Sequence, residues 1–200
     1  MNNVGVVDQS KRQFLTSALT VVGTVGAGFI AVPFLAQMQP STKAEAAGAP
    51  VEIDIGKMET GQLIRAEWRG KPDWVLNRTP DVLRILENET DHLRDPLSQE
   101  SIQPSYSENP LRSIKPEVFI VVGLCTHLGC SPTFRPETAP PDLGPDWKGG
   151  FFCPCHGSFF DLAGRVYRGV PAPTNLVVPP HRYVTDSLIV IGEDQQEAAA

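Results

Sequence analysis

Hydrophobic and polar positions divide the chain into two unlike parts. Between Arg12 and Lys43 no side chain is charged, and residues 14–36 have the pattern of one long, mildly apolar helix. From residue 51 onward the apolar runs are short and either alternating or rich in β-branched residues, and Gly, Pro and Asn separate them. The pattern predicts one helix able to span a membrane, followed by a mainly β head.

Within the head, the clearest strand signals lie near its start and its middle. Residues 51–55 alternate, as in a strand buried on one face. A strand is also predicted over 117–124, because its residues 118–124 form an apolar run that leads into Cys125. The remaining expectations are strands at 62–69, 73–76, 176–178 and 187–191, a short helix from Thr79 to about residue 87, and an irregular stretch over 88–116. These elements predict a small antiparallel β domain that carries its chemistry on loops.

The apolar segment is long enough to cross a bilayer. Residues 14–36 extend about 34 Å as a helix, and the hydrocarbon core of a membrane is about 30 Å thick. The hydroxyl groups in this segment can bond back to the preceding helical turn, so they do not prevent spanning. We predict a cytoplasmic segment over 1–13, a transmembrane helix over 14–38, a flexible tether or hinge over 39–50 and the head over 51–200.

The amino-terminal segment also has the features of an export signal. The sequence S-K-R-Q-F-L at 10–15 resembles a twin-arginine signal with Lys in place of the first Arg, and Lys11 and Arg12 favour a cytoplasmic amino terminus. A cleaved signal peptide is the alternative, because A-E-A at 44–46 resembles a cleavage site. The apolar regions of signal peptides usually run about 7–15 residues, which favours a retained anchor for this longer segment.

Composition and charge narrow the possible classes. With 200 residues, 41% hydrophobic and 20% charged, the chain is neither wholly disordered nor a multi-span membrane protein. Its 17 Gly and 19 Pro argue against a helical bundle, and a net charge of −6 argues against a nucleic-acid partner. All four cysteines lie between residues 125 and 155, and two of the four histidines, His127 and His156, lie within 125–156. This concentration predicts a binding site.

Two short segments hold these residues, C-T-H-L-G-C at 125–130 and C-P-C-H-G-S at 153–158. Six candidate ligands exceed the four of a zinc site, and a framework of disulfides alone leaves the paired histidines unexplained. A [2Fe–2S] cluster with two Cys on one iron and two His on the other accounts for both loops. The pairs are Cys125 with His127 and Cys153 with His156, so each loop can address both irons.

The two segments resemble the cluster boxes of Rieske proteins, specifically those of the iron–sulfur subunits of bacterial cytochrome bc complexes. The resemblance covers the export motif, the anchor, the tether and the head. It implies a Rieske-type antiparallel β-sandwich with a small cluster-binding subdomain, whose cluster-binding loops lie within about 123–173. By this resemblance, one [2Fe–2S] cluster is held by Cys125 and Cys153 on one iron and by His127 and His156 on the outer iron.

The same resemblance assigns residues around the cluster. Cys130 and Cys155 are expected to form a disulfide, and Ser158 to donate a hydrogen bond to the cluster or its ligands. The segment G-V-P-A-P at 169–173 resembles the family's proline loop, so Pro171, Ala172 and Pro173 are expected to shield the cluster. Phe160 stands where the family often has Tyr. Because a hydroxyl donor near sulfur favours the reduced cluster, its loss predicts a lower potential.

The implied function is electron transfer within a respiratory, proton-translocating quinol–cytochrome c reductase, with activity only inside the complex. The head is expected to take an electron, coupled to a proton, from quinol and to carry it to a c-type cytochrome by moving. Each imidazole ligand keeps a titratable second nitrogen. In the family the residue matching His156 faces quinol, but the residues here do not separate it from His127. Leu128 and Gly129 are expected to form the docking surface.

The expected partners are a b-type and a c-type cytochrome subunit, quinol (ubiquinol by family resemblance) and the lipid bilayer, within a dimeric complex. The expected location is a bacterial inner membrane, crossed once, with the head on the periplasmic side. Three alternatives remain open: a Rieske subunit of an arsenite-oxidase-type enzyme, a soluble ring-hydroxylating ferredoxin, and a tethered structural zinc module. We expect His92 and His181 to be surface or structural residues and Trp68, Trp74 and Trp147 to serve packing.

Overall fold

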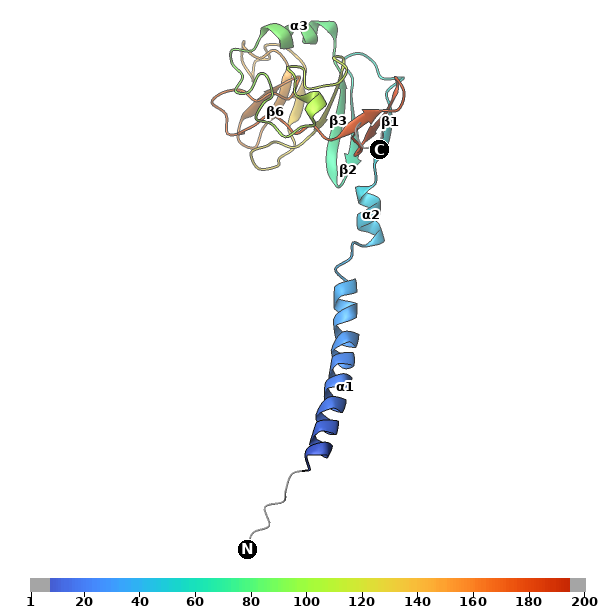
Figure 1. Ribbon diagram of the computed structural model, residues 1–200. Helices are drawn as coiled ribbons and strands as arrows, with labels where there is room; N and C mark the ends of the chain where they lie inside the picture. Colours follow the sequence, from blue (N-terminus) through green and yellow to red (C-terminus); the bar gives the residue numbers. More distant parts are fainter. Residues whose placement is uncertain (1–7, 195–200) are drawn as a thin grey trace. The chain divides into compact units, whose positions relative to one another are not determined.

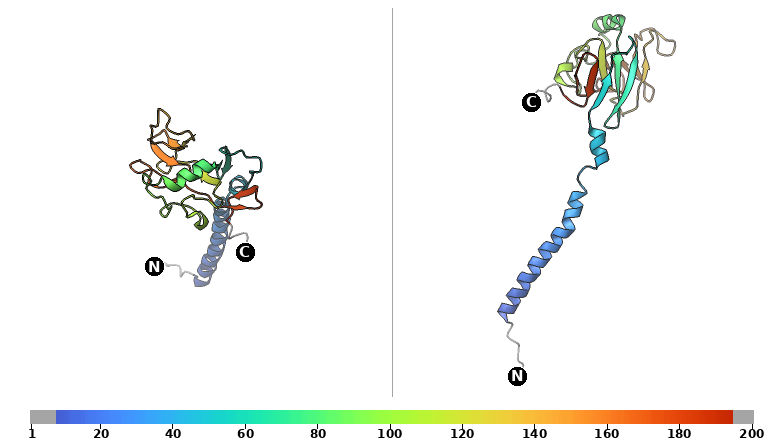
Figure 2. Two further views of the ribbon diagram at one scale, coloured as in Figure 1. Left: turned by 90° about the horizontal axis from the view of Figure 1, so that it is seen from above. Right: turned by 90° about the vertical axis from the view of Figure 1, so that its right-hand side faces the viewer.

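The computed structural model describes residues 8–194, and the chain divides into two compact units between Ala46 and Ala47. The first seven residues of the predicted cytoplasmic segment and the last six of the predicted head lie outside the described residues. Figures 1 and 2 show the two units, one built on a long helix and the other on β-sheets.

The first unit holds helix α1 (Gln9–Ala36). The Asp8 side chain caps it by accepting from the backbone N–H groups of Ser10 and Lys11, at 3.0 and 3.2 Å. The helix starts before residue 14, so it includes the export motif. Its threonine hydroxyls bond back to carbonyls of the preceding turn, as expected: Thr16 to Arg12, Thr20 to Thr16 and Thr24 to Thr20. Among the described residues it is the one helix long and apolar enough to cross a membrane.

A second helix, α2 (Thr42–Gly48), lies inside the segment expected to be a flexible tether. Its sequence is rich in Ala with Lys and Glu, which are strong helix formers. Ser41 caps it, because its hydroxyl accepts from the backbone N–H of Ala44 at 3.2 Å. The segment therefore contains regular structure that the sequence analysis did not predict, and its role as a flexible tether or hinge remains a prediction.

The described residues of the head form three antiparallel three-stranded sheets. Their strand orders are β1-β9-β8, β2-β3-β4 and β5-β6-β7, so the fold is mainly β, as predicted (Figure 1). The strands are β1 (Val51–Asp54), β2 (Leu63–Trp68), β3 (Lys71–Asn77), β4 (Val118–Val122), β5 (Thr133–Arg135), β6 (Gly150–Cys153), β7 (Ser158–Asp161), β8 (His181–Tyr183) and β9 (Leu188–Ile191). Helix α3 (Pro80–Asn88) follows β3 directly and is capped by Thr79, as expected, while a short 3₁₀ helix, η1 (Ser105–Ser107), interrupts the irregular stretch.

The β2-β3-β4 sheet is the centre of the head because apolar side chains cover both of its faces. Val75 and Ile120 pack on one face with residues of β1 and β9. Trp74, Phe119 and Val121 pack on the other face in a core that also contains Cys125 and Cys153. Two-sided burial explains why residues 118–122 of the expected strand are uniformly apolar rather than alternating. The predicted site therefore lies at the edge of the second core.

The expected strand at 176–178 is wrong. Three single backbone hydrogen bonds tie this segment to three different partners: Leu176 N–H to the Gly164 carbonyl, Val178 N–H to the Ile102 carbonyl, and Val122 N–H to the Val177 carbonyl. A strand needs a ladder to one neighbour. The segment is an extended connection that passes several elements, and its residues Leu176 and Val178 are buried against them.

Candidate metal centre

Two loops of similar construction carry the predicted ligands. The first follows β4, and the second joins β6 to β7. In each loop the backbone N–H of a glycine donates to the carbonyl of the cysteine four residues earlier, Gly129 to Cys125 at 2.9 Å and Gly157 to Cys153 at 3.0 Å. These glycines have φ values of +80° and +71°, a conformation that disfavours other residues. The paired turns present a cysteine and a histidine from each loop toward the same region.

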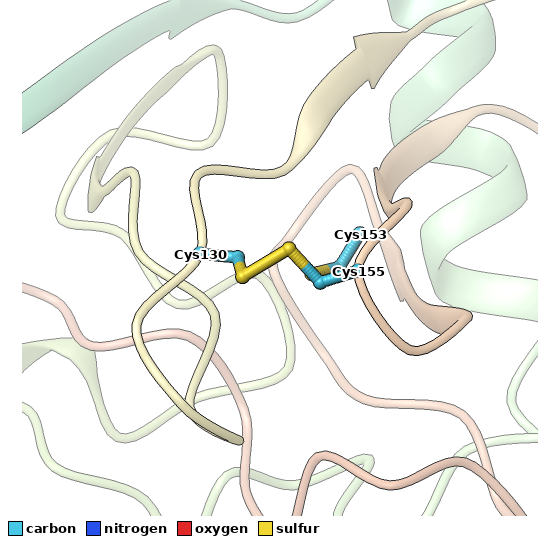
Figure 3. A group of neighbouring side chains, drawn as sticks. All are labelled: Cys130, Cys153 and Cys155. Carbon is cyan, nitrogen blue, oxygen red and sulfur yellow. A yellow bond between two sulfur atoms is a disulfide. The ribbon is translucent and has the colours of Figure 1, made fainter.

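A disulfide joins the two loops. The sulfur atoms of Cys130 and Cys155 are bonded, and Figure 3 shows the bridge running between the loops with Cys153 beside it. The predicted pairing is confirmed. The three sulfur atoms of Cys130, Cys153 and Cys155 lie within 4.8 Å of one another, but the bridge leaves Cys153 as the free thiol of this group.

The two remaining cysteines are free and buried. Cys125 and Cys153 expose 3% and 2% of their surface and belong to the same hydrophobic core. Burial raises the pKa of the Cys125 thiol, and the neighbouring Cys153 thiol raises it further, whereas a hydrogen bond with the Ser158 hydroxyl lowers it. Two adjacent buried thiolates are unfavourable unless a cation lies between them. This pair is thus suited to a metal.

The two candidate histidines face each other. Each follows one of the free cysteines closely in the sequence. The rings of His127 and His156 lie 4.7 Å apart, centroid to centroid, in an edge-to-face arrangement. Nδ1 of His127 is buried without a hydrogen-bond partner among the described residues. Because such a nitrogen is costly to bury, a coordination bond is the arrangement that satisfies it. Two thiols and two imidazoles are the donor set of a Rieske-type [2Fe–2S] cluster, and the residues present fit that group.

The predicted proline loop lies against both ligand loops. Ala172 is fully buried in the core that holds the two free thiols, and its backbone N–H donates to the Ser158 hydroxyl at 3.1 Å. Pro171 and Pro173 on either side are exposed. The Thr126 hydroxyl donates to the Thr174 carbonyl at 2.7 Å, which ties the first ligand loop to the end of the proline loop. Sequence reasoning missed Thr126, although it lies within the first box.

The outer surface of the site is apolar and open. Leu128 is 72% exposed, and Gly129 and His156 are exposed as well, whereas His127 is half-buried. This exposure excludes core packing as the role of Leu128. Exposure thus distinguishes His127 from His156, whereas the sequence alone does not separate them.

Phe160, the expected departure from the family pattern, is fully buried on β7. It is paired with Phe151 across the hairpin and shares the core with the two free thiols. Phenylalanine brings no hydroxyl to that core. On this strand Ser158, and not residue 160, supplies a hydroxyl that forms a hydrogen bond with a free thiol.

The other residues noted in the sequence pack elsewhere. His181 is buried, with Nδ1 2.8 Å from the Pro179 carbonyl, and burial lowers the pKa of its imidazole. The ring of His92 lies 4.3 Å from that of Tyr167, centroid to centroid, at an interplanar angle of 59°. Trp74 and Trp147 are buried. The expectation of structural roles for the two histidines and of packing for these two tryptophans is confirmed.

Comparison with known proteins agrees with this geometry. The family model described as "Rieske [2Fe-2S] domain" matches residues 53–180, and the one described as "Ubiquitinol-cytochrome C reductase Fe-S subunit TAT signal" matches residues 1–41. Together they cover both the head and the apolar helix.

Similar proteins carry matching descriptions. The ubiquinol-cytochrome c reductase iron-sulfur subunit of Allochromatium vinosum is 58% identical over 96% of this chain and 93% of its own length. The subunit of the same name from Blastochloris viridis is 40% identical over 96% of this chain and 98% of its own. A chain of a hyperthermophilic respiratory Complex III is 29% identical, with a TM-score of 0.46, over 88% of this chain and 98% of that one. This chain belongs to the Rieske [2Fe–2S] family and, within it, to the iron–sulfur subunits of ubiquinol–cytochrome c reductases.

Proposed function

We propose that Cys125 and Cys153 bind one iron of a single [2Fe–2S] cluster and that His127 and His156 bind the other. The observation that carries this proposal is the division of the cysteines, of which two are bridged and two are free, buried and adjacent. The facing imidazoles complete the set of four.

The bound cluster supplies a one-electron acceptor whose potential is raised because two of its ligands are neutral imidazoles rather than thiolates. The chain's own residues prepare its surroundings. The Ser158 hydroxyl accepts from the Ala172 N–H and directs its own hydrogen toward the Cys125 sulfur. The Ala172 side chain and the disulfide keep water from the thiol side of the site.

Quinol is proposed to dock at the exposed end of the site. The His156 ring is accessible and can accept a hydrogen bond from a quinol hydroxyl through its outward nitrogen, which then takes the proton as the electron leaves. Leu128 and Gly129 form the apolar surface around it. The greater burial of His127 supports His156 as the imidazole that meets quinol.

The anchor and tether place this chemistry at a membrane. We infer that α1 spans the bilayer once, that Lys11 and Arg12 keep its start in the cytoplasm, and that the head lies on the periplasmic side of a bacterial inner membrane. The match of residues 1–41 to an export-signal family supports this orientation. The head would then move about the segment 39–50 between quinol and a c-type cytochrome, in a dimeric complex with a b-type subunit.

Substitution of the four proposed ligands tests the site. We would replace Cys125 and Cys153 by Ser, and His127 and His156 by Asn, one at a time in the full-length chain. Iron and acid-labile sulfide per chain are the readout. His92→Asn is the matched control, because this histidine contacts Tyr167 outside the site.

Each ligand variant is expected to lose iron and sulfide, while the His92→Asn control keeps the content of the unmodified protein. A ligand variant that retained the full content would remove that residue from the proposed set.

A further inference from the structure

One fully buried arginine, Arg112, extends into the head from the irregular stretch before β4. Arg112 has a φ of +54°, a left-handed conformation that non-glycine residues rarely adopt. The Asn109 side chain shapes this turn, because its amide nitrogen donates to the carbonyls of Tyr106 and Ser113. The turn directs the Arg112 side chain inward, although nothing in the sequence pattern of 88–116 marks this position.

The guanidinium of Arg112 binds two segments that flank the candidate cluster. Nη1 donates to the carbonyls of Ala163 and Gly164, just after β7, at 3.2 and 3.3 Å. Nη2 donates to the carbonyl of Leu176, just after the proline loop, at 2.6 Å. The same side chain therefore holds together the end of the second ligand hairpin and the end of the loop that covers the thiols.

Two neutral side chains fix the guanidinium from the opposite side. Nε donates to the Ser98 hydroxyl at 2.7 Å, and Nε and Nη2 both reach Oε1 of Gln103, at 3.2 and 3.1 Å. The six hydrogen bonds of Arg112 thus end on neutral oxygens. Arg165 differs, because it forms a buried ion pair with Asp161 at 2.6 Å.

Three consecutive residues at the end of the proline loop each form a hydrogen bond with a different segment. Thr174 is bound by Thr126 of the first ligand loop, and Leu176 by Arg112. Asn175 between them is fully buried, accepts from the Val166 N–H at 2.8 Å and donates to the Ser98 hydroxyl at 3.3 Å. The Ser98 hydroxyl accepts from both Asn175 and Arg112 and therefore joins their hydrogen bonds into one buried polar network.

We propose that Arg112 is a positioning residue for the iron–sulfur site and that the network of Arg112, Ser98, Gln103 and Asn175 sets where the proline loop lies. By fixing the carbonyl of Leu176, Arg112 holds Ala172 at the distance from which its N–H donates to the Ser158 hydroxyl. That hydroxyl then remains oriented toward the Cys125 sulfur. The effect on the cluster rests on the ligation proposed above, whereas the effect on the loop does not.

Two variants and one control test the proposal in the full-length, detergent-solubilised protein. Arg112→Lys keeps the charge and loses the fork that binds several carbonyls at once. Ser98→Ala removes the shared hydroxyl without leaving a buried charge, so it carries the test if Arg112→Lys does not fold. Tyr106→Phe is the control, because its hydroxyl ties the same stretch to His181 of β8, at 2.8 Å, and not to the proline loop.

Hydrogen exchange and the midpoint potential are the two readouts. We expect amides at 166–176 to exchange about tenfold faster in Arg112→Lys and Ser98→Ala, as the loss of a charge-assisted hydrogen bond implies. We also expect a lower midpoint potential in both, because the Ser158 donor is less well oriented. In Tyr106→Phe, exchange at 166–176 and the potential should stay as in the unmodified protein.

Unchanged exchange at 166–176 in the two variants, or an equal change in Tyr106→Phe, would overturn the proposal. Faster exchange with an unchanged potential would overturn the link from the loop to the cluster. If the unmodified protein bound no histidine-ligated cluster, the proposed ligand set would be wrong. The proposal for Arg112 and the proline loop would still be tested, because hydrogen exchange measures the loop with or without the cluster.

Discussion

Removing the disulfide is the perturbation whose size follows most directly from the structure. The bridge between Cys130 and Cys155 closes a loop with a sequence separation of 25 residues. In the chain-entropy description, a loop of this length restricts the unfolded chain by about 3.5 kcal/mol. The variant with both cysteines changed to Ser should lose about that much stability.

Thermal unfolding followed by circular dichroism measures this loss. For a domain the size of the head, about 3.5 kcal/mol corresponds to a decrease in Tm of about 10 °C. The two ligand loops should also loosen, because the bridge joins them directly, so iron should be released at a lower temperature than in the unmodified protein.

A reducing agent supplies the internal control. It should lower the Tm of the unmodified protein to that of the double variant and leave the variant itself unchanged. If the double variant melted within about 2 °C of the unmodified protein and held its iron equally well, the reasoning from loop closure would be refuted.

Three further predictions concern single residues of the head. Burial raises the pKa of the Asp73 carboxyl to about 6 from an ordinary value of 3.8, so the folded state binds this proton more tightly than the unfolded state. The contribution to stability is full below pH 3.8 and is lost as the pH rises through about 6; Asp73→Asn should therefore gain up to about 3 kcal/mol above that pH and flatten the pH profile of denaturant unfolding. Phe160→Tyr should raise the midpoint potential measured by protein-film voltammetry, and an unchanged or lower value would reject the role given to the missing hydroxyl. Leu128→Ala should slow quinol oxidation in the assembled complex at unchanged iron content, and normal turnover would count against a docking role.

The outline of the fold was predictable where one periodicity dominates. Residues 51–55 alternate because β1 is buried on one face, and residues 118–122 are uniformly apolar because β4 is buried on both. The short strands β5, β6, β7 and β8 were missed. β5 has three residues, too few to show a period, although the aromatic pairs on either side of the second box are typical of strands and were a usable signal for β6 and β7.

The site was predictable as far as it is contiguous in sequence. The spacing of cysteines and histidines within two boxes identified the candidate ligands, and the disulfide inferred from the family was confirmed. The supports of the site were not predictable, because each joins distant residues. Thr126 meets Thr174, and Arg112 meets Leu176, through backbone carbonyls that every residue possesses. No residue type or spacing marks such an acceptor.

The electron paramagnetic resonance spectrum of the dithionite-reduced, full-length protein tests the central claim most directly. Ligation by two imidazoles and two thiolates predicts one signal with an average g-value well below that of all-cysteine [2Fe–2S] clusters, with iron and sulfide present in equal amounts. An average g-value like that of the all-cysteine clusters, or a protein that contains zinc and no sulfide, would contradict the account.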